Sequence, residues 1–187
     1  MQVSINPTYL CNFRCSFCYL TEGQLSDPKT TPIDKIDEKL KEIDTYQKIT
    51  GVDIYGGEIG LLNYNYLTAL DECIRKYTGN INVITNLSKI NPYFRHSDIT
   101  LSVSWDFTAR QGWERVLENM MTIDRPLSVL LLASPELLKR RPSEVLSYLY
   151  QVPMLESIEI KPYSSNQANQ LSMRGQLELE FEHWLLS

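Results

Sequence analysis

The chain has 187 residues, enough for one domain with its own hydrophobic core, and its 43% hydrophobic and 22% charged residues are an ordinary globular balance. Eighteen basic residues against 23 acidic ones give a net charge of -5, which argues against a nucleic-acid substrate. No signal peptide is evident, and no apolar run approaches the roughly 20 residues that span a bilayer. We therefore expect a cytoplasmic protein with reduced cysteines, forming a single domain over residues 1–187.

The first half of the chain alternates predicted strands with predicted helices. Residues 2–6 alternate and are β-branched in part, which predicts a strand, and a cysteine-containing loop follows. Thr31 can cap a helix with Pro32 at its first position, and Gly51 can end that helix. The next predicted elements are a strand at 52–55, a helix through 67–74 and a strand at 80–84.

The second half continues the same alternation. After a short helix near 92–96, the sequence predicts a strand at 99–104, a helix through 113–120 and a strand at 127–133. Ser134 and Pro135 open another helical stretch, which Pro142 interrupts. A sixth strand at 157–160 follows, and Leu177, Phe181, Trp184 and Leu185 line a last helix.

Six strand–helix units predict an α/β fold with a parallel sheet and right-handed crossovers. Six units cannot easily close an eight-fold barrel, so we expect a partial (β/α)6 barrel that is curved and open on one side. In such folds the chemistry lies at the C-terminal ends of the strands. Each motif described below falls at such an end.

Three cysteines lie close together in the loop after the first predicted strand. Cys11, Cys15 and Cys18 are separated by three residues and then by two. Iron–sulfur cubanes normally take four thiolates, so three close cysteines can hold three irons and leave the fourth iron open to another ligand. The fourth cysteine of the chain, Cys73, lies within a helical pattern and is predicted to be a buried small side chain.

Two other readings of the cysteines stay open. Three cysteines and a histidine could form a structural zinc site, although neither His96 nor His183 has the local spacing of a zinc knuckle. Cys15 and Cys18 could also form a redox pair, which would leave Cys11 without a role.

The cysteine segment resembles the signature of the radical S-adenosylmethionine (SAM) superfamily, in which an aromatic residue, here Phe17, precedes the third cysteine. The resemblance implies a [4Fe-4S] cluster with SAM at its open iron, reductive cleavage of SAM, and Phe17 near the adenine. Gly56, Gly57 and Glu58 resemble the family's motif that binds the methionine amine of SAM. Without that context, the three residues could form a plain turn with a solvated carboxylate.

Further residues at strand ends are candidates for SAM binding. Asn86 follows the third strand, and Ser104 and Asp106 resemble the family's Ser-x-Asp segment, although Phe107 replaces the usual glycine. Asp106 could instead cap the following helix. Lys161 opens a polar loop through Gln167 that related enzymes use for adenine and substrate contacts, and a simple surface loop is the alternative. The basic residues Arg14, Arg140 and Arg141 could favour an anionic substrate or simply be solvated.

The resemblance implies an enzyme that abstracts hydrogen from a peptide or small-metabolite substrate and receives electrons from an external donor of the flavodoxin or ferredoxin type. These 187 residues contain no cysteines for an auxiliary cluster, which favours redox-neutral outcomes. Two alternatives stay open: a non-catalytic iron–sulfur or SAM-sensing protein, and a zinc-stabilised binding module.

Overall fold

Six parallel strands form one sheet in which each strand pairs with the next along the chain, in the order β1-β2-β3-β4-β5-β6. The computed structural model describes residues 1–95, 98–107, 110–162 and 176–186. The strands are β1 (Gln2–Ile5), β2 (Gly51–Ile54), β3 (Ile81–Thr85), β4 (Ile99–Ser104), β5 (Leu127–Ala133) and β6 (Leu155–Pro162). The helices are α1 (Glu22–Leu25), α2 (Ile33–Tyr46), η1 (Ile59–Leu61), α3 (Tyr64–Arg75), η2 (Pro92–Arg95), α4 (Trp113–Thr122), α5 (Pro135–Leu138), α6 (Pro142–Leu149) and α7 (Gln176–Leu186).

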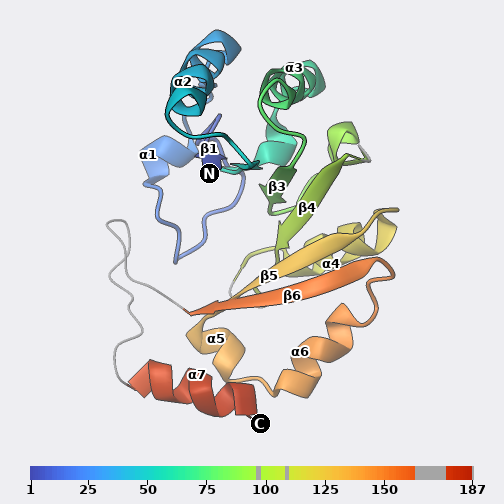
Figure 1. Cartoon of the computed structure of the whole chain (residues 1–187). Coiled ribbons are helices and arrows are strands. Elements are labelled where there is room, and N and C mark those ends of the chain that lie inside the picture. Colours follow the sequence, from blue (N-terminus) through green and yellow to red (C-terminus); the bar gives the residue numbers. More distant parts are fainter. Residues whose placement is uncertain (96–97, 108–109, 163–175, 187) are drawn as a thin grey trace.

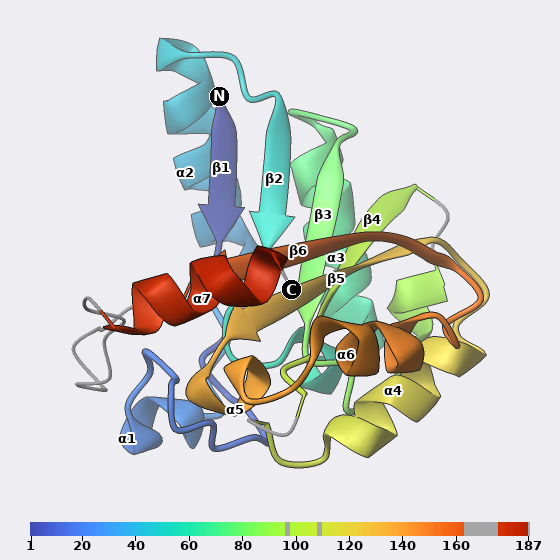
Figure 2. The same cartoon turned by 90° about the horizontal axis from the view of Figure 1, so that it is seen from below.

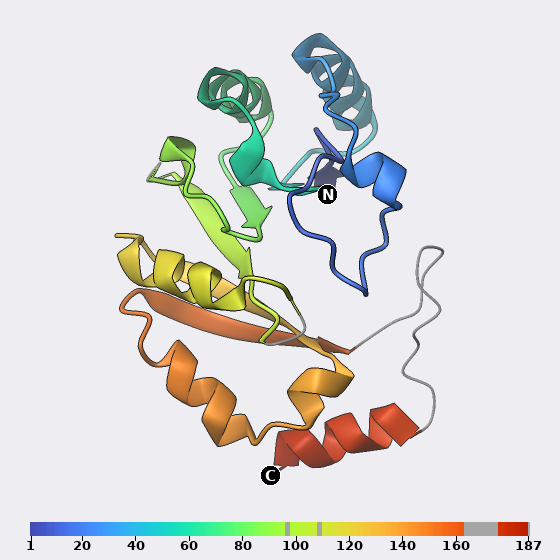
Figure 3. The same ribbon diagram turned by 180° about the vertical axis from the view of Figure 1, so that it is seen from behind.

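The sheet curves into an open, partial barrel. β1 and β6 are the two edge strands of the sheet, and the helices from α2 to α6 lie along its outer side (Figures 1 and 3). The cysteine loop and α1 lie at the end of the sheet toward which β1 and β2 point (Figure 2). The parallel sheet and the partial barrel predicted from the sequence are confirmed.

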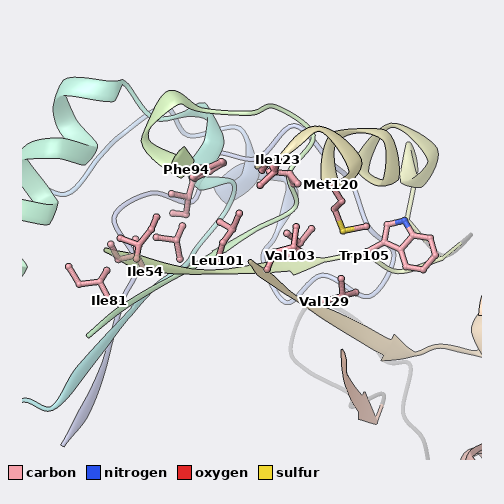
Figure 4. Packing of buried hydrophobic residues seen from close by; sticks show 14 of the residues in the cluster. Ile54, Ile81, Phe94, Leu101, Val103, Trp105, Met120, Ile123 and Val129 are labelled. Carbon is pink, nitrogen blue, oxygen red and sulfur yellow. The ribbon is translucent and has the colours of Figure 1, made fainter. Parts of the chain in front are cut away.

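The main core lies between the outer face of the sheet and the helices. Along β5, buried residues alternate with partly exposed ones, as expected for a strand with one covered face. Leu67, Leu70 and Ile74 of α3 are fully buried. Figure 4 shows how Met120 of α4 and the neighbouring Ile123 pack beside strand residues in this core.

The inner face of the sheet carries a band of polar side chains. Asn82 Nδ2 donates to Asp53 Oδ1 over 2.9 Å, and Ser102 Oγ donates to Asn82 Oδ1 over 3.0 Å. On β5 and β6, Ser157 Oγ donates to Ser128 Oγ over 2.8 Å. Closed eight-stranded barrels fill their interior with branched apolar side chains. These polar pairs therefore suit a barrel that does not close around a dry interior.

Two local predictions at helix ends were wrong. The N-cap of α2 is Pro32, which makes no side-chain capping bond, so Thr31 does not cap this helix. The helix ends at Tyr46, and Gly51 is the first residue of β2. The predicted last helix is present as α7, in which Trp184 is buried and Leu185 is 53% exposed.

The short helix α1 was not predicted. Thr21 and Gln24 form a capping box, in which each side chain bonds the backbone of the other residue, and this fixes the helix inside the cysteine loop. No helix in the described part of the chain is long and apolar enough to cross a membrane.

The packing of α3 against the sheet can be tested with Leu70→Ala. Leu70 is 0% exposed, so the substitution should lower the free energy of unfolding by about 2–5 kcal/mol, through lost burial and the cavity left behind. Tyr46→Ala is the control, because Tyr46 is 85% exposed and its loss should change stability by about 0.5 kcal/mol or less. Urea denaturation of both variants measures the difference, and equal losses would contradict the packing.

Candidate functional site

The three clustered cysteines line one cavity of about 200 Å³ at the C-terminal end of the sheet. The cysteine loop forms one side of this cavity, and the ends of β2, β3 and β4 form the other. Its other lining residues are Phe13, Phe17, Tyr19, Leu20, Leu25, Tyr55, Gly56, Gly57, Ile84, Thr85, Asn86, Ser104 and Arg110. The structure therefore brings together most of the residues that the sequence singled out, although they come from four separate segments.

The cysteine loop is held in shape by its own backbone and by Arg14. The Cys11 N–H donates to the Leu25 carbonyl over 3.0 Å, and the Cys18 N–H donates to the Cys15 carbonyl over 3.0 Å. The Arg14 guanidinium donates to the Cys11 carbonyl over 2.7 Å and to Ser26 Oγ over 3.0 Å. Arg14 thus joins the two ends of the loop, a role that the sequence did not indicate.

Burial affects the protonation of two of the clustered thiols, those of Cys11 and Cys15. Desolvation raises the pKa of Cys11, and it raises the pKa of Cys15 to about 11, so both are thiols at neutral pH without a metal. Backbone N–H groups approach two sulfurs at 3.4 Å, from Phe13 to Cys11 and from Leu20 to Cys18. Such donors stabilise a thiolate once a metal displaces the proton.

A single metal ion has no ready-made site here. Among the described residues, no three His, Cys, Asp or Glu side chains converge closely enough to hold one ion. Zinc needs four donors around one atom. His183 is exposed on α7, and His96 lies outside the described residues. Cysteines that bind separate irons of a cubane do not have to converge on one point, so the arrangement suits a cluster better than zinc.

The two glycines of the Gly-Gly-Glu motif let the cysteine loop lie directly against the end of β2. A Cβ atom on Gly57 would lie 2.2 Å from the Leu10 carbonyl oxygen, and one on Gly56 would lie 2.4 Å from the Thr8 carbonyl oxygen. In this close contact the Gly57 N–H donates to Thr8 O over 2.9 Å. Larger residues here would push the loop away from the sheet.

Glu58 is fully buried, so the alternative of a plain turn with a solvated carboxylate is wrong. Its carboxylate accepts hydrogen bonds from the Gly60 N–H and the Asn86 N–H, each over 2.6 Å, and from the Thr85 hydroxyl. Desolvation raises the pKa of Glu58, while these donors oppose the rise. Glu58 is not among the residues that line the cavity. A direct contact between Glu58 and SAM stays a prediction, and the contacts that the structure gives are with Gly60, Thr85 and Asn86.

Asp106 is also turned toward protein partners. It is 3% exposed, Oδ1 accepts from the Leu132 N–H over 2.8 Å, and Oδ2 accepts from Arg110 Nε over 2.9 Å. The N-cap of α4 is Gly112, so Asp106 does not cap that helix. Asp106 instead joins β4 to β5 and holds Arg110.

Sequence reasoning missed Arg110. It is the only basic residue among the described residues that line the cavity, and its side chain is 12% exposed. The guanidinium carbon lies 5.4 Å from the Phe17 ring centroid and 5.9 Å from that of Phe13. Its charge also lowers the pKa of Cys15 against the larger effect of burial. No local pattern in the sequence indicates this ion pair, because Asp106 and Arg110 lie before α4 and the four-residue rule for helix pairs does not apply to them.

Of the other predicted site residues, some line the cavity and others lie away from it. Asn86 and Ser104 line the cavity. Lys161 is exposed at the end of β6, pairs with Glu159 over 3.4 Å and is not among the lining residues. Tyr163 through Gln167 lie outside the described residues. Cys73 is 2% exposed in α3, as predicted for a buried small side chain.

The sequence matches the family model of the Radical SAM superfamily over residues 5–123, which is more than half of the chain. The match covers the cysteine loop, the Gly-Gly-Glu motif and β4. No curated protein matches the sequence.

Several solved structures share the fold. SuiB of Streptococcus suis bound to the precursor peptide SuiA is 15% identical with a TM-score of 0.73, covering 99% of this chain and 46% of that one. A histidine-tagged form of anSMEcpe with bound AdoMet is 14% identical with a TM-score of 0.73, covering 97% of this chain and 57% of that one. A third structure, native anSMEcpe with bound AdoMet and Cp18Cys peptide, gives the same identity and TM-score. The chain spans about half the length of these proteins.

The buried ion pair gives a stability prediction for Asp106→Asn. The Asn can still accept from the Leu132 N–H, but the Arg110 charge loses its partner, so the free energy of unfolding should fall by about 3–5 kcal/mol. The matched control is Glu144→Gln, which breaks the more exposed pair with Arg140 at the same spacing and should cost about 0–1 kcal/mol. Urea denaturation separates the two, and a cost below about 1 kcal/mol for Asp106→Asn would contradict the buried pair.

Proposed function

Because the chain belongs to the radical SAM superfamily, we propose that it is an enzyme that holds a [4Fe-4S] cluster at Cys11, Cys15 and Cys18 and uses it to cleave SAM. When bound, the cluster would supply one electron for cleavage of the SAM sulfonium to methionine and a 5'-deoxyadenosyl radical, which would abstract hydrogen from the substrate. The observation that carries the proposal is the shared cavity lined by these three cysteines, the Gly-Gly turn and Arg110.

The donor set fits a cubane with one open iron. Three thiols and no fourth cysteine line the cavity among the described residues, since Cys73 is buried within α3. The N–H groups of Phe13 and Leu20 already point at two of the sulfurs. These donors would stabilise the thiolates that the cluster requires.

Groups complementary to the amino-acid part of SAM lie in the cavity wall and beside it. Arg110, in the wall, is a buried cation suited to a carboxylate. Asn6 is not a lining residue, but its Oδ1 lies against the lining residue Gly56, is buried and accepts no hydrogen bond from the described residues. An ammonium group bound beside Gly56 and Gly57 would satisfy this acceptor, whose burial without a donor is otherwise costly.

The aromatic and aliphatic lining residues would keep water from the reacting atoms. Phe13, Phe17, Leu20 and Leu25 border the cavity with the cysteines. A radical that met water or a mobile side chain would be lost to side reactions, and an apolar lining limits both. Phe17, which Arg110 holds from one side, is suited to contact the adenine ring.

We infer that the substrate is a peptide. This inference is supported by two structural neighbours, which are described as bound to a precursor peptide and to the Cp18Cys peptide. A small metabolite is the alternative. An external donor of the flavodoxin or ferredoxin type would supply the electron that reduces the cluster.

Cluster ligation is tested by single Cys→Ala variants reconstituted without oxygen. The unaltered protein should hold about four irons and show a brown chromophore. Changing Cys11, Cys15 or Cys18 should abolish the chromophore, whereas Cys73→Ala should keep it. Iron analysis and absorption spectra decide this, and a cluster lost in Cys73→Ala would show that the ligands are assigned wrongly.

The reaction is tested by incubating the reconstituted protein with dithionite and SAM. Slow cleavage should give 5'-deoxyadenosine without substrate, and a peptide deuterated at the reactive carbon should pass its label into that product. Mass spectrometry detects both, with Cys15→Ala as the inactive control. If SAM binds to a reduced cluster and no candidate substrate yields 5'-deoxyadenosine, the protein is a sensor and not an enzyme.

A further inference from the structure

We propose that Asn86 sets the reduction potential of the cluster, by donating a hydrogen bond from its side-chain amide to the sulfur of Cys11. Asn86 Nδ2 lies 3.8 Å from Cys11 Sγ and 3.3 Å from Asn12 Oδ1. The inference rests on the proposed function, because it concerns the cluster that Cys11 would hold. Asn86 acts here as a positioning residue for the electron transfer.

The amide of Asn86 has a fixed orientation. Its Oδ1 accepts from the Ser88 N–H over 2.9 Å, and an amide that accepts on that side must turn its NH2 group toward the cysteine loop. Asn86 is 4% exposed, so water does not compete strongly for that NH2 group. The direction of the donor therefore follows from the backbone and not from a freely rotating side chain.

The backbone beneath this amide is equally constrained. The Asn86 N–H donates to buried Glu58 over 2.6 Å, and the Leu87 N–H donates to Thr85 Oγ1 over 2.9 Å. Leu87 has a φ of 50°, the left-handed conformation that leucine rarely adopts. Its side chain is fully buried in the core, and that burial can hold the unusual turn. The donor is thus built into the fold before any cluster binds.

A hydrogen bond to a cluster sulfur stabilises the more negative, reduced form and raises the reduction potential. Two N–H groups reach Cys11 Sγ in the described structure, from the Phe13 backbone and from the Asn86 side chain. Of these, the Asn86 donor belongs to a side chain, so a substitution can remove it without a proline in the cysteine loop. The structure therefore assigns to the Asn86 side chain a contribution to the reduction potential that a substitution can change.

The test is an EPR-monitored redox titration of the reconstituted chain without SAM. In Asn86→Leu the donor is gone, so at a fixed potential the ratio of reduced to oxidised cluster should fall roughly two- to fivefold, the effect of one weak hydrogen bond. Asn86→Asp keeps an oxygen for the Ser88 N–H but adds negative charge, so its ratio should fall further. Iron content must match the unaltered protein.

The matched control is Ser88→Ala. It removes the hydroxyl that pairs with Asn12 but keeps the backbone N–H that orients Asn86, so the midpoint should not move. Equal shifts in Ser88→Ala and Asn86→Leu would overturn the proposal, because the potential would then follow loop packing. An unshifted Asn86→Leu, or loss of the cluster from both Asn86 variants, would also overturn it.

The outcome separates this inference from the proposed function. If the unaltered protein forms no reducible cubane, the proposed function fails. If it forms one and the Asn86 variants titrate at the same potential, only the role of Asn86 fails.

Discussion

The buried carboxylate of Glu58 is the interaction on which the candidate site depends. An ionised carboxylate without partners would be very costly in this interior, and Glu58 is stable there because three donors surround it. Two of those donors belong to Thr85 and Asn86, at the end of the neighbouring strand. The need to satisfy one charge therefore ties the end of β2 to the end of β3 and fixes the residues that face the cavity.

The same short segment also anchors the cysteine loop. The Gly57 and Glu58 N–H groups donate to the carbonyls of Thr8 and Leu10, at 2.9 and 2.8 Å. The contact is close enough that neither Gly56 nor Gly57 has room for a side chain. The Gly-Gly-Glu sequence thus has two structural roles, since the glycines admit the loop and the glutamate holds the next strand. Any role of this motif in binding a ligand follows from its position between the cysteine loop and the end of β3.

The sequence predicted the features that depend on local pattern. The order and residue types of the predicted strands and helices gave all six strands, and the spacing of Cys11, Cys15 and Cys18 predicted that they lie together. What it could not predict depends on contacts between distant segments. The burial of Glu58 depends on hydrogen-bond donors 27 and 28 residues away in the sequence. Arg110 is held at the cavity by Asp106, which is itself fixed by a hydrogen bond from the Leu132 N–H of β5. The Thr31 cap failed for the same reason, because the Thr31 N–H is bonded to the Pro7 carbonyl near the cysteine loop and the helix begins later.

Glu58 and Asp106 follow the same physical logic. Each acid comes after a strand, is almost fully buried, and holds a neighbour that faces the cysteines. A carboxylate placed directly beside three thiolates would repel them and resist a further electron. Through these acids, the cavity instead presents the neutral amide of Asn86 and the cation of Arg110. Neither acid lines the cavity, so groups that favour added negative charge lie nearest the cysteines. The acids still act at a distance, because burial first, and then the Glu58 and Asp106 charges, raise the pKa of Cys11 and Cys15 respectively.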